Sequence, residues 1–376
     1  MSFLIFNKTR VKIDYQLKGR KMKKQKKILN FQGYKLFIGI DVHKKQWTVT
    51  LRLRELELVT FSMNPSPPEL FNYLKRHYPN AEYHSVYEAG FCGFWIHRQL
   101  SELGINNMVV NPADVPTTHK EKTQKRDKRD SRKLARELAE GSSLEAIYIP
   151  TKRQESLRLL SRLLVQVTKR TTQSKNRIKQ FLHTQGIHLP QRAEISHWSK
   201  RFIIWLNTIE FEYDHSKYYL DKLLRDLERE RLEKLNLLRQ MKKIIKGNKI
   251  ISYLRTAPGV GTITAFTFYA EIIDIFRFQK LDHLIAYIGI IPSVEASDEK
   301  EKILGLTNRC NKYLRYLIIE AAWIAVRIDP ALTLAFKELL KTRSSQKTII
   351  RIAKKLVNRM RYLWINQTEY VMAVVE

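Results

Sequence analysis

The stretch Leu36-Phe-Ile-Gly-Ile-Asp41-Val42 decides the fold, because an uninterrupted run of apolar or small residues leads to a single carboxylate. A short apolar run of this kind, bounded by polar residues, is typical of a buried β-strand. A carboxylate at the end of a buried strand costs free energy unless it binds a partner. Asp41 is therefore the first candidate functional residue.

The segments after this strand predict an α/β domain. Residues 46–53 and 56–63 alternate apolar and polar side chains, which predicts two further strands, paired antiparallel. Ser66, Pro67 and Glu69 predict a helix start, with Ser as the cap and Glu closing a capping box. The remaining elements expected are a strand at 82–88, a helix at 91–103 ended by Gly104, a strand at 105–110 and a basic helix at 128–140. Three antiparallel strands followed by alternating elements are the order of the ribonuclease-H-like fold.

The second half of the chain predicts mainly helices. Residues 151–185 place leucines and other seam residues at alternating steps of three and four, a heptad pattern that favours a coiled coil. A second long helix is expected at 199–246, so the two predict a helical hairpin or coiled-coil arm. This arm fits either an intramolecular spacer or a surface for dimerisation or RNA binding. Residues 250–342 predict a third, helical unit, and residues 344–364 a basic amphipathic helix.

These patterns predict a chain of α/β plus all-α class in five segments. They are a basic N-terminal extension (1–33), the α/β domain (34–150), the helical coiled-coil region (151–248), a helical C-terminal domain (249–343) and a basic C-terminal helix (344–376). The basic extension can contact phosphate. Met22, which precedes a run of lysines, is an alternative start of translation.

The charge balance predicts a polyanionic partner. Lys and Arg number 68 against 37 Asp and Glu, a formal net charge of +31. Basic side chains that neutralise phosphates release counterions, whereas an enzyme of small metabolites gains nothing from such self-repulsion. A ribosomal-type protein fits the charge but not the carboxylates, and a membrane-surface protein would need a detachable amphipathic helix. Two cysteines without metal-ligand spacing, and no apolar run of about 20 residues, favour a cytoplasmic, nucleoid-associated protein without a membrane partner.

Four acids form the main candidate site: Asp41, Glu88, Asp127 and Asp130. Glu88 ends a predicted strand as Asp41 does, and residues 127 and 130 share one face at the start of a helix. Each acid alone would be an ordinary turn or surface residue. Together, at strand and helix ends, they offer the hard oxygen ligands of two Mg²⁺ ions, with Mn²⁺ as the alternative. Two such ions can activate the attacking oxygen and stabilise the leaving oxygen of a phosphodiester.

Two further motifs lie in the C-terminal half. The turn Pro258-Gly-Val-Gly261 between helices is typical of a helix-hairpin-helix, whose backbone N–H groups can hold a phosphate, although a simple tight turn is the alternative. Ser293 and Ser297 lie in a polar stretch that predicts a loop between two apolar helices. A serine there could act as a nucleophile if a metal or a base activated it.

Several short motifs follow one another in a set order: Phe37-Ile-Gly-Ile-Asp41-Val-His-Lys44, Tyr87-Glu-Ala-Gly90, Val110-Asn-Pro112, Asp127-x-x-Asp130-Ser-Arg-Lys-Leu-Ala, Pro258-Gly-Val-Gly261 and Gly289-Ile-Ile-Pro292. Over about residues 34–340 this order resembles the transposases of IS110/IS1111-type insertion sequences. The resemblance implies a RuvC-like domain whose four acids bind Mg²⁺, a coiled-coil linker and a C-terminal transposase domain. It also implies donor and target duplex DNA, a non-coding bridge RNA and a homo-oligomer, either a dimer or a tetramer, as partners.

The same resemblance implies that Ser297 is a nucleophile that forms a protein–DNA ester, with Ser293 as the alternative. This chain departs from the family at the neighbours of Ser297, where Ala296 and Asp298 replace a small polar residue and a glycine. Two other functions stay open: a Holliday-junction nuclease that uses water, and a basic nucleic-acid-binding protein without catalysis. The sequence leaves undetermined the DNA targets, the RNA, the number of subunits and whether this copy is active.

Overall fold

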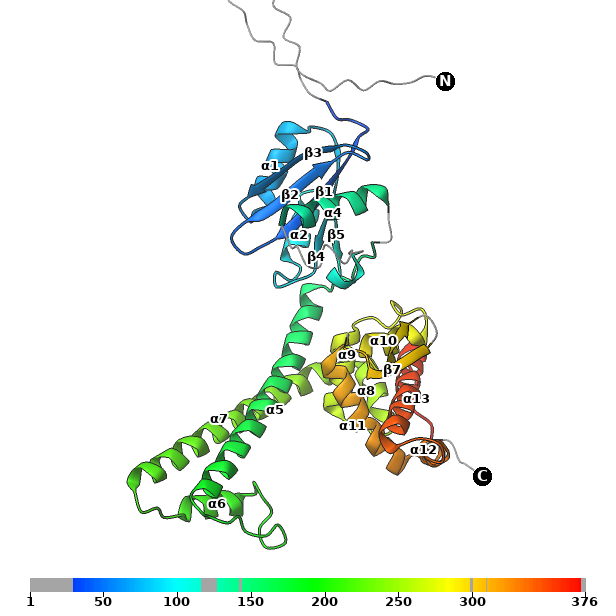
Figure 1. The fold of residues 1–376 in the computed structure, drawn as a ribbon. Coiled ribbons are helices and arrows are strands. Elements are labelled where there is room, and N and C mark those ends of the chain that lie inside the picture. The colour runs from blue at the N-terminus through cyan, green and yellow to red at the C-terminus, as the bar shows by residue number, and fades with distance from the viewer. Residues whose placement is uncertain (1–29, 116–126, 142–143, 298–299, 309, 373–376) are drawn as a thin grey trace, which may run out of the picture. The chain divides into compact units, whose positions relative to one another are not determined.

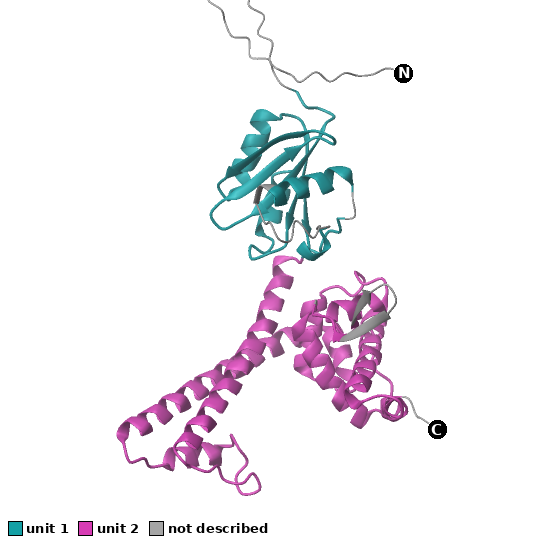
Figure 2. Ribbon diagram, in the orientation of Figure 1, with its two compact units in different colours: residues 1–149 teal, residues 150–376 magenta. Residues whose placement is uncertain are grey.

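The chain forms two compact units, residues 1–149 and 150–376 (Figure 2). This computed structural model describes residues 30–115, 127–141, 144–297, 300–308 and 310–372. The side chains of 127–128 and 293–304 are outside the description. The predicted basic extension therefore lies outside the described residues up to residue 29. The five-segment division is finer than the two units and stays a prediction.

A five-stranded mixed sheet is the centre of the first unit (Figure 1). Its strands are β1 (Lys35–Val42), β2 (Trp47–Arg52), β3 (Glu57–Met63), β4 (Glu82–Glu88) and β5 (Asn106–Val110). They are ordered β3-β2-β1-β4-β5, in which β1–β2 and β2–β3 are antiparallel and β1–β4 and β4–β5 are parallel. The predicted strands are confirmed, and their order and directions agree with the expected ribonuclease-H-like arrangement.

Helices cover both faces of this sheet. They are α1 (Pro67–His77), α2 (Trp95–Glu102) and α4 (Asp127–Glu140), and the short 3-10 helix η1 (Pro112–Asp114) follows β5. Ser66 is confirmed as the cap of α1, since its side chain accepts a hydrogen bond from the backbone N–H of Glu69. The predicted capping box is wrong, because the Glu69 carboxylate accepts from Asn64 and the backbone N–H of Ser66 donates to the carbonyl oxygen of Asn64. Leu70 of α1 and Leu100 of α2 join the core on one face, whereas Leu134 of α4 packs on the other.

Helix α4 packs directly against Gly39 of β1. A Cβ atom on Gly39 would overlap the carbonyl oxygen of Ser131 and lie 2.5 Å from the backbone nitrogen of Ala135. A buried hydrogen bond of 2.9 Å between the hydroxyls of Thr50 and Ser131 fastens the same helix to β2. Thr50 also contacts the hydroxyl of Thr60 at 2.9 Å. The glycine therefore sets how near the start of α4 comes to the strand ends.

Two long helices begin the second unit. Helix α5 (Lys152–Thr184) has 33 residues, which is about 50 Å of helix. It packs along α7 (Asp214–Ile245), as Figure 1 shows. Predicted seam residues are buried on α5, among them Leu164, Thr171 and Ile178. These contacts agree with the expected helical hairpin, and the coiled-coil geometry itself stays a prediction.

The second predicted helix, residues 199–246, is wrong in one respect, because it is broken into α6 (Lys200–Thr208) and α7. The break lets α6 fold back, so that Phe202 and Leu206 become fully buried. Phe211, in the intervening turn, contacts the ring of Phe181 on α5 with 5.6 Å between centroids. No glycine or proline lies between α6 and α7, so the sequence carries no local signal of this break.

Six helices share one hydrophobic core in the rest of this unit. They are α8 (Lys249–Thr256), α9 (Thr262–Ile272), α10 (Leu281–Ile288), α11 (Lys312–Ile328), α12 (Pro330–Leu340) and α13 (Ser345–Asn366). The predicted C-terminal helix is confirmed as α13. In the described part of the chain, no helix combines the length and apolar character needed to cross a membrane.

The polar loop expected after Pro292 is wrong, because this segment forms an antiparallel hairpin of β6 (Pro292–Ser297) and β7 (Lys300–Leu306). Val294-Glu-Ala alternates apolar and charged residues, which is the period of a strand, whereas the partner run Lys300-Glu-Lys is charged throughout. Each run is too short to predict a strand unless the two are seen to pair.

The turn Pro258-Gly-Val-Gly261 joins α8 and α9, as expected for an interhelical turn. Gly259 has a φ of +75°, and a Cβ atom there would overlap the carbonyl oxygen of Ala321 on α11. Close packing against α11 therefore accounts for Gly259. Phosphate binding by this turn stays a prediction.

We expect Gly39→Ala to lower the free energy of unfolding of the first unit by about 2 kcal/mol or more, since backbone atoms must move to admit the methyl group. Urea unfolding followed by circular dichroism measures the change. Gly247→Ala is the control, because no atom lies within 4 Å of the added Cβ. Equal stabilities of the two variants would contradict the close approach of α4.

Candidate active site

Asp41 and Glu88 lie side by side on the face of the sheet that α4 covers. Gly39 of β1 is paired with Val86 of the parallel strand β4. Val86 packs with Leu134 of α4. Side chains alternate along a strand, so Asp41 and Glu88, each two residues further on, project from the same face. The fold thus brings two acids together that are 47 positions apart in the sequence.

Helix α4 adds Asp130 to these two acids. Asp41, Glu88 and Asp130 line one pocket of about 130 Å³. The other lining residues are Ile40, Val42, Ala89, Gly90, Phe91, Cys92 and Leu134. The two residues of the close contact are near these acids. Gly39 is two residues before Asp41 and lies on the same face of β1, and Ser131 directly follows Asp130 in α4. The pocket therefore depends on how closely α4 packs on β1.

The Asp41 carboxylate is largely withdrawn from solvent, with 19% of its side chain exposed. His43, two residues further on, places its Nε2 atom 3.2 Å from an Asp41 carboxylate oxygen. Sequence reasoning did not assign a role to His43. The one indication in the sequence is that His43 lies two residues after Asp41. In an extended chain this spacing places the two side chains on the same side.

The turn that follows Glu88 is held by hydrogen bonds. The backbone N–H of Ala89 donates to the carbonyl oxygen of Val110 at 2.7 Å. The Tyr87 hydroxyl accepts from the backbone N–H of His97 and donates to the carbonyl oxygen of Gly93. Burial raises the pKa of Tyr87, so its hydroxyl stays a neutral donor. These contacts fix the chain on both sides of Glu88.

The pocket acids suit a divalent cation by donor type, because carboxylate oxygens are the ligands of Mg²⁺ and Mn²⁺. Within the described side chains, however, no three His, Cys, Asp or Glu residues are close enough together to hold one metal ion. Asp127 is the first residue of α4, one turn before Asp130, and its side chain lies outside the description. A complete metal site would thus need Asp127 or a shift of the pocket acids.

Family models match both units of the chain. The DEDD-type model of the IS110 group, described as a transposase, matches residues 38–186, which include all four predicted acids. The model of the transposase IS116/IS110/IS902 family matches residues 251–337. Together they cover well over half of the chain.

The chain belongs to the IS110 family of transposases.

Three relatives show how far the likeness extends. A Sinorhizobium fredii protein named y4qE, described as a candidate transposase, is 26% identical over 73% of this chain and 66% of its own length. The transposase for insertion sequence element IS1111A of Coxiella burnetii is 26% identical over 72% of this chain and 74% of its own. The transposase for insertion sequence element IS1533 of Leptospira borgpetersenii is 26% identical over 65% of this chain and 72% of its own length. The alignments span about two thirds to three quarters of these relatives.

The serines predicted for this IS110-family chain lie in the second unit. Ser293 and Ser297 are both in β6, and Ser297 is its last residue, opposite Lys300 of β7. Their side chains lie outside the description. The structure therefore brings Asp41, Glu88 and Asp130 to one pocket, gives the backbone position of Asp127, and places the serines on a separate hairpin.

We expect the pocket thiol of Cys92 to react slowly with alkylating reagents, because burial raises its pKa and the thiolate is the reactive form. In a Cys310→Ser variant, the rate of reaction with iodoacetamide should increase with pH, and the midpoint of this increase should lie at a higher pH than the midpoint for N-acetylcysteine. Mass spectrometry between about pH 7 and about pH 10 measures it. A midpoint pH equal to or lower than that of N-acetylcysteine would show that the pocket is open to water.

Proposed function

We propose that this protein is the recombinase of an insertion sequence, which cuts and exchanges DNA strands with the pocket acids and a serine nucleophile. The observation that carries the proposal is the meeting of Asp41, Glu88 and Asp130 in one pocket. That pocket lies within the part of the chain that the DEDD-type transposase model matches. Partly buried acids of like charge are costly to bring together, so binding of a cation or transfer of a phosphate is the best reason for their meeting.

The proposed cofactor is Mg²⁺, with Mn²⁺ as the alternative, held by Asp41, Glu88, Asp127 and Asp130. A bound divalent cation would supply charge stabilisation at the phosphate oxygens. The carboxylates themselves set the geometry, since Asp41 and Glu88 stand on a rigid sheet and residues 127 and 130 lie one turn apart on α4. His43, beside Asp41, would orient that carboxylate.

The proposed nucleophile is the hydroxyl of Ser297. Its oxygen forms a bond to phosphorus, the bond from phosphorus to the DNA 3′ oxygen breaks, and the serine proton passes to that leaving oxygen. A 3′-hydroxyl of the partner duplex then attacks the serine ester, which restores the serine and joins the exchanged strands. Each step exchanges one phosphate ester for another, so ATP is not required. Ser297 could be supplied by the same chain or by another protomer.

Basic surfaces support duplex DNA, both donor and target, as the substrate. Lys347, Arg351 and Lys355 are exposed on α13 at intervals of four residues, so they follow one face of the helix. A row of like charges costs stability in the free protein and favours a polyanion. The bridge RNA and the dimer or tetramer follow from the family resemblance and are part of this proposal, as is a nucleoid location.

We expect Asp41→Asn, Glu88→Gln and Asp130→Asn each to lower Mg²⁺-dependent cleavage of the element's junction DNA by about a hundredfold or more, because each removes a carboxylate ligand. The assay uses protein purified with its co-purifying RNA and a denaturing gel. Glu102→Gln removes an exposed acid of the same unit and should cleave normally. Full activity in the three pocket variants would instead favour a nucleic-acid-binding protein without catalysis.

We expect the wild-type protein to form a DNA-linked band on the denaturing gel, and Ser297→Ala to abolish both this band and strand exchange, because the ester oxygen is missing. Ser293→Ala, in the same strand, is the control and should keep the band. The reverse pattern would make Ser293 the nucleophile. Cleaved DNA without a linked band, unchanged in Ser297→Ala, would favour a junction nuclease that uses water.

A further inference from the structure

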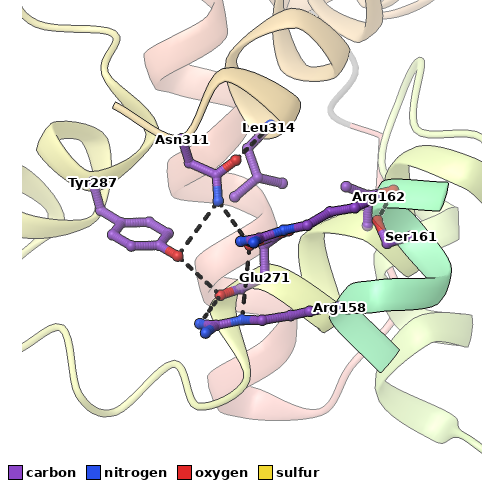
Figure 3. Close-up of polar contacts among 8 residues, drawn as sticks. Arg158, Ser161, Arg162, Glu271, Tyr287, Asn311 and Leu314 are labelled. Carbon is purple, nitrogen blue, oxygen red and sulfur yellow. Dashed lines mark hydrogen bonds and ion pairs between the residues drawn. The ribbon is translucent and has the colours of Figure 1, made fainter. Parts of the chain in front are cut away.

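A buried carboxylate lies at the end of α9, outside the proposed active site. Glu271 is fully buried, and the Arg162 guanidinium donates to both of its carboxylate oxygens at 2.7 and 2.9 Å (Figure 3). Arg158 pairs with the same carboxylate at 3.7 Å and donates to the backbone oxygen of Glu271 at 3.0 Å. Both arginines belong to the first turns of α5. This ionic cluster therefore joins α5 to α9.

Asn311 extends the cluster to a third element. Its amide nitrogen donates to Glu271 at 2.9 Å, and its side-chain oxygen caps α11 by accepting from the N–H of Leu314 at 3.1 Å (Figure 3). The backbone N–H of Asn311 donates to the carbonyl oxygen of Tyr287 at 2.9 Å. The Tyr287 hydroxyl in turn donates to the backbone oxygen of Glu271. Asn311 is thus held by α9, α10 and its own helix at once.

Asn311 stands at the base of the β6–β7 hairpin. The chain leaves α10 at Gly289 and enters β6, and it returns from β7 through Cys310. Gly289 has a φ of +85°, and a Cβ atom there would overlap Cys310, so the two ends of the hairpin touch. The backbone N–H of Thr307 donates to the carbonyl oxygen of Ile291 at 3.2 Å. A group that holds Asn311 therefore holds the hairpin.

We propose that Glu271 is a positioning residue, which fixes the base of the β6–β7 hairpin to the start of α5 through Asn311 on one side and Arg162 on the other. A buried ion pair adds little stability over apolar residues of the same size, so its gain is a defined geometry. The consequence for Ser297, at the end of β6, rests on the proposed function. The anchoring of the hairpin does not.

A second buried carboxylate offers a matched control at the other end of α11. Asp329 is fully buried, pairs with Arg359 at 3.1 Å and accepts from the Tyr370 hydroxyl and the N–H of Leu332. Among the described residues, these partners lie outside the hairpin. Asp329→Asn keeps a side chain that can cap α12 and removes one buried charge, as Glu271→Gln does. It reports on loss of stability alone.

The test uses a donor–acceptor reversal. Asn311→Asp keeps the cap of α11 but sets a second carboxylate against Glu271. Glu271→Gln weakens the pairing with Arg162. The double variant Glu271→Gln, Asn311→Asp has the net charge of the wild type and restores the contact, with the glutamine amide now donating to the aspartate. The coupling between residues 271 and 311 is then obtained by comparing the double variant with the two single variants.

The first readout is amide hydrogen exchange of the free full-length protein, in peptides that cover β7 and Asn311. We expect about tenfold faster exchange in each single variant, recovery of at least about threefold in the double variant, and wild-type exchange in Asp329→Asn. Exchange that is unchanged in the single variants, or equally raised in Asp329→Asn, would overturn the inference.

The second readout is the rate of the DNA-linked band at saturating junction DNA. We expect a drop of about tenfold in the single variants with unchanged DNA affinity, and recovery in the double variant. A wild-type protein that forms no band would defeat the serine mechanism, while the exchange result would still decide the anchoring of the hairpin. Unchanged band formation together with faster exchange would overturn the link from Glu271 to Ser297.

Discussion

The close approach of α4 to Gly39 is the contact on which the candidate active site depends. With no side chain on Gly39, the backbone of α4 at Ser131 and Ala135 can pack directly on β1. The Thr50–Ser131 hydrogen bond satisfies the polar groups that this contact buries. Asp130 is one residue before Ser131, so the packing that seats the helix also brings its carboxylate to the strand ends. The packing of the fold and the proposed site thus depend on the same few atoms.

Buried and partly buried acids serve two different ends in this chain. Glu271 and Asp329 are fully buried, and each is matched by an arginine and by further hydrogen-bond donors, as a stable buried charge requires. Asp41, Glu88 and Asp130 instead line one pocket together, as carboxylates of like charge. The first pattern stabilises a geometry, and the second favours binding of a cation or chemistry on a phosphate.

The contacts at the two ends of α11 fix the helix that follows the strand hairpin. Asn311 begins the helix beside Glu271, and Asp329 ends it beside Arg359. Gly259 packs on the middle of the same helix. With its ends and its centre fixed, α11 is a rigid base for the hairpin that precedes it. The order of the elements in the sequence makes this possible, since α11 begins six residues after the last residue of β7.

Local chemistry determined the strands, most helices and the candidate acids from the sequence, because periodicity, caps and a carboxylate at the end of an apolar strand act over a few residues. Asp41 and Glu88 could be selected in this way, and the family motifs agreed with them. The break between α6 and α7, the β6–β7 hairpin, His43 and the Glu271 cluster could not. The break between α6 and α7 and the Glu271 cluster depend on contacts between residues distant in the sequence, such as Phe181 with Phe211 or Arg162 with Glu271. Such contacts leave no local pattern, so only the tertiary structure decides them.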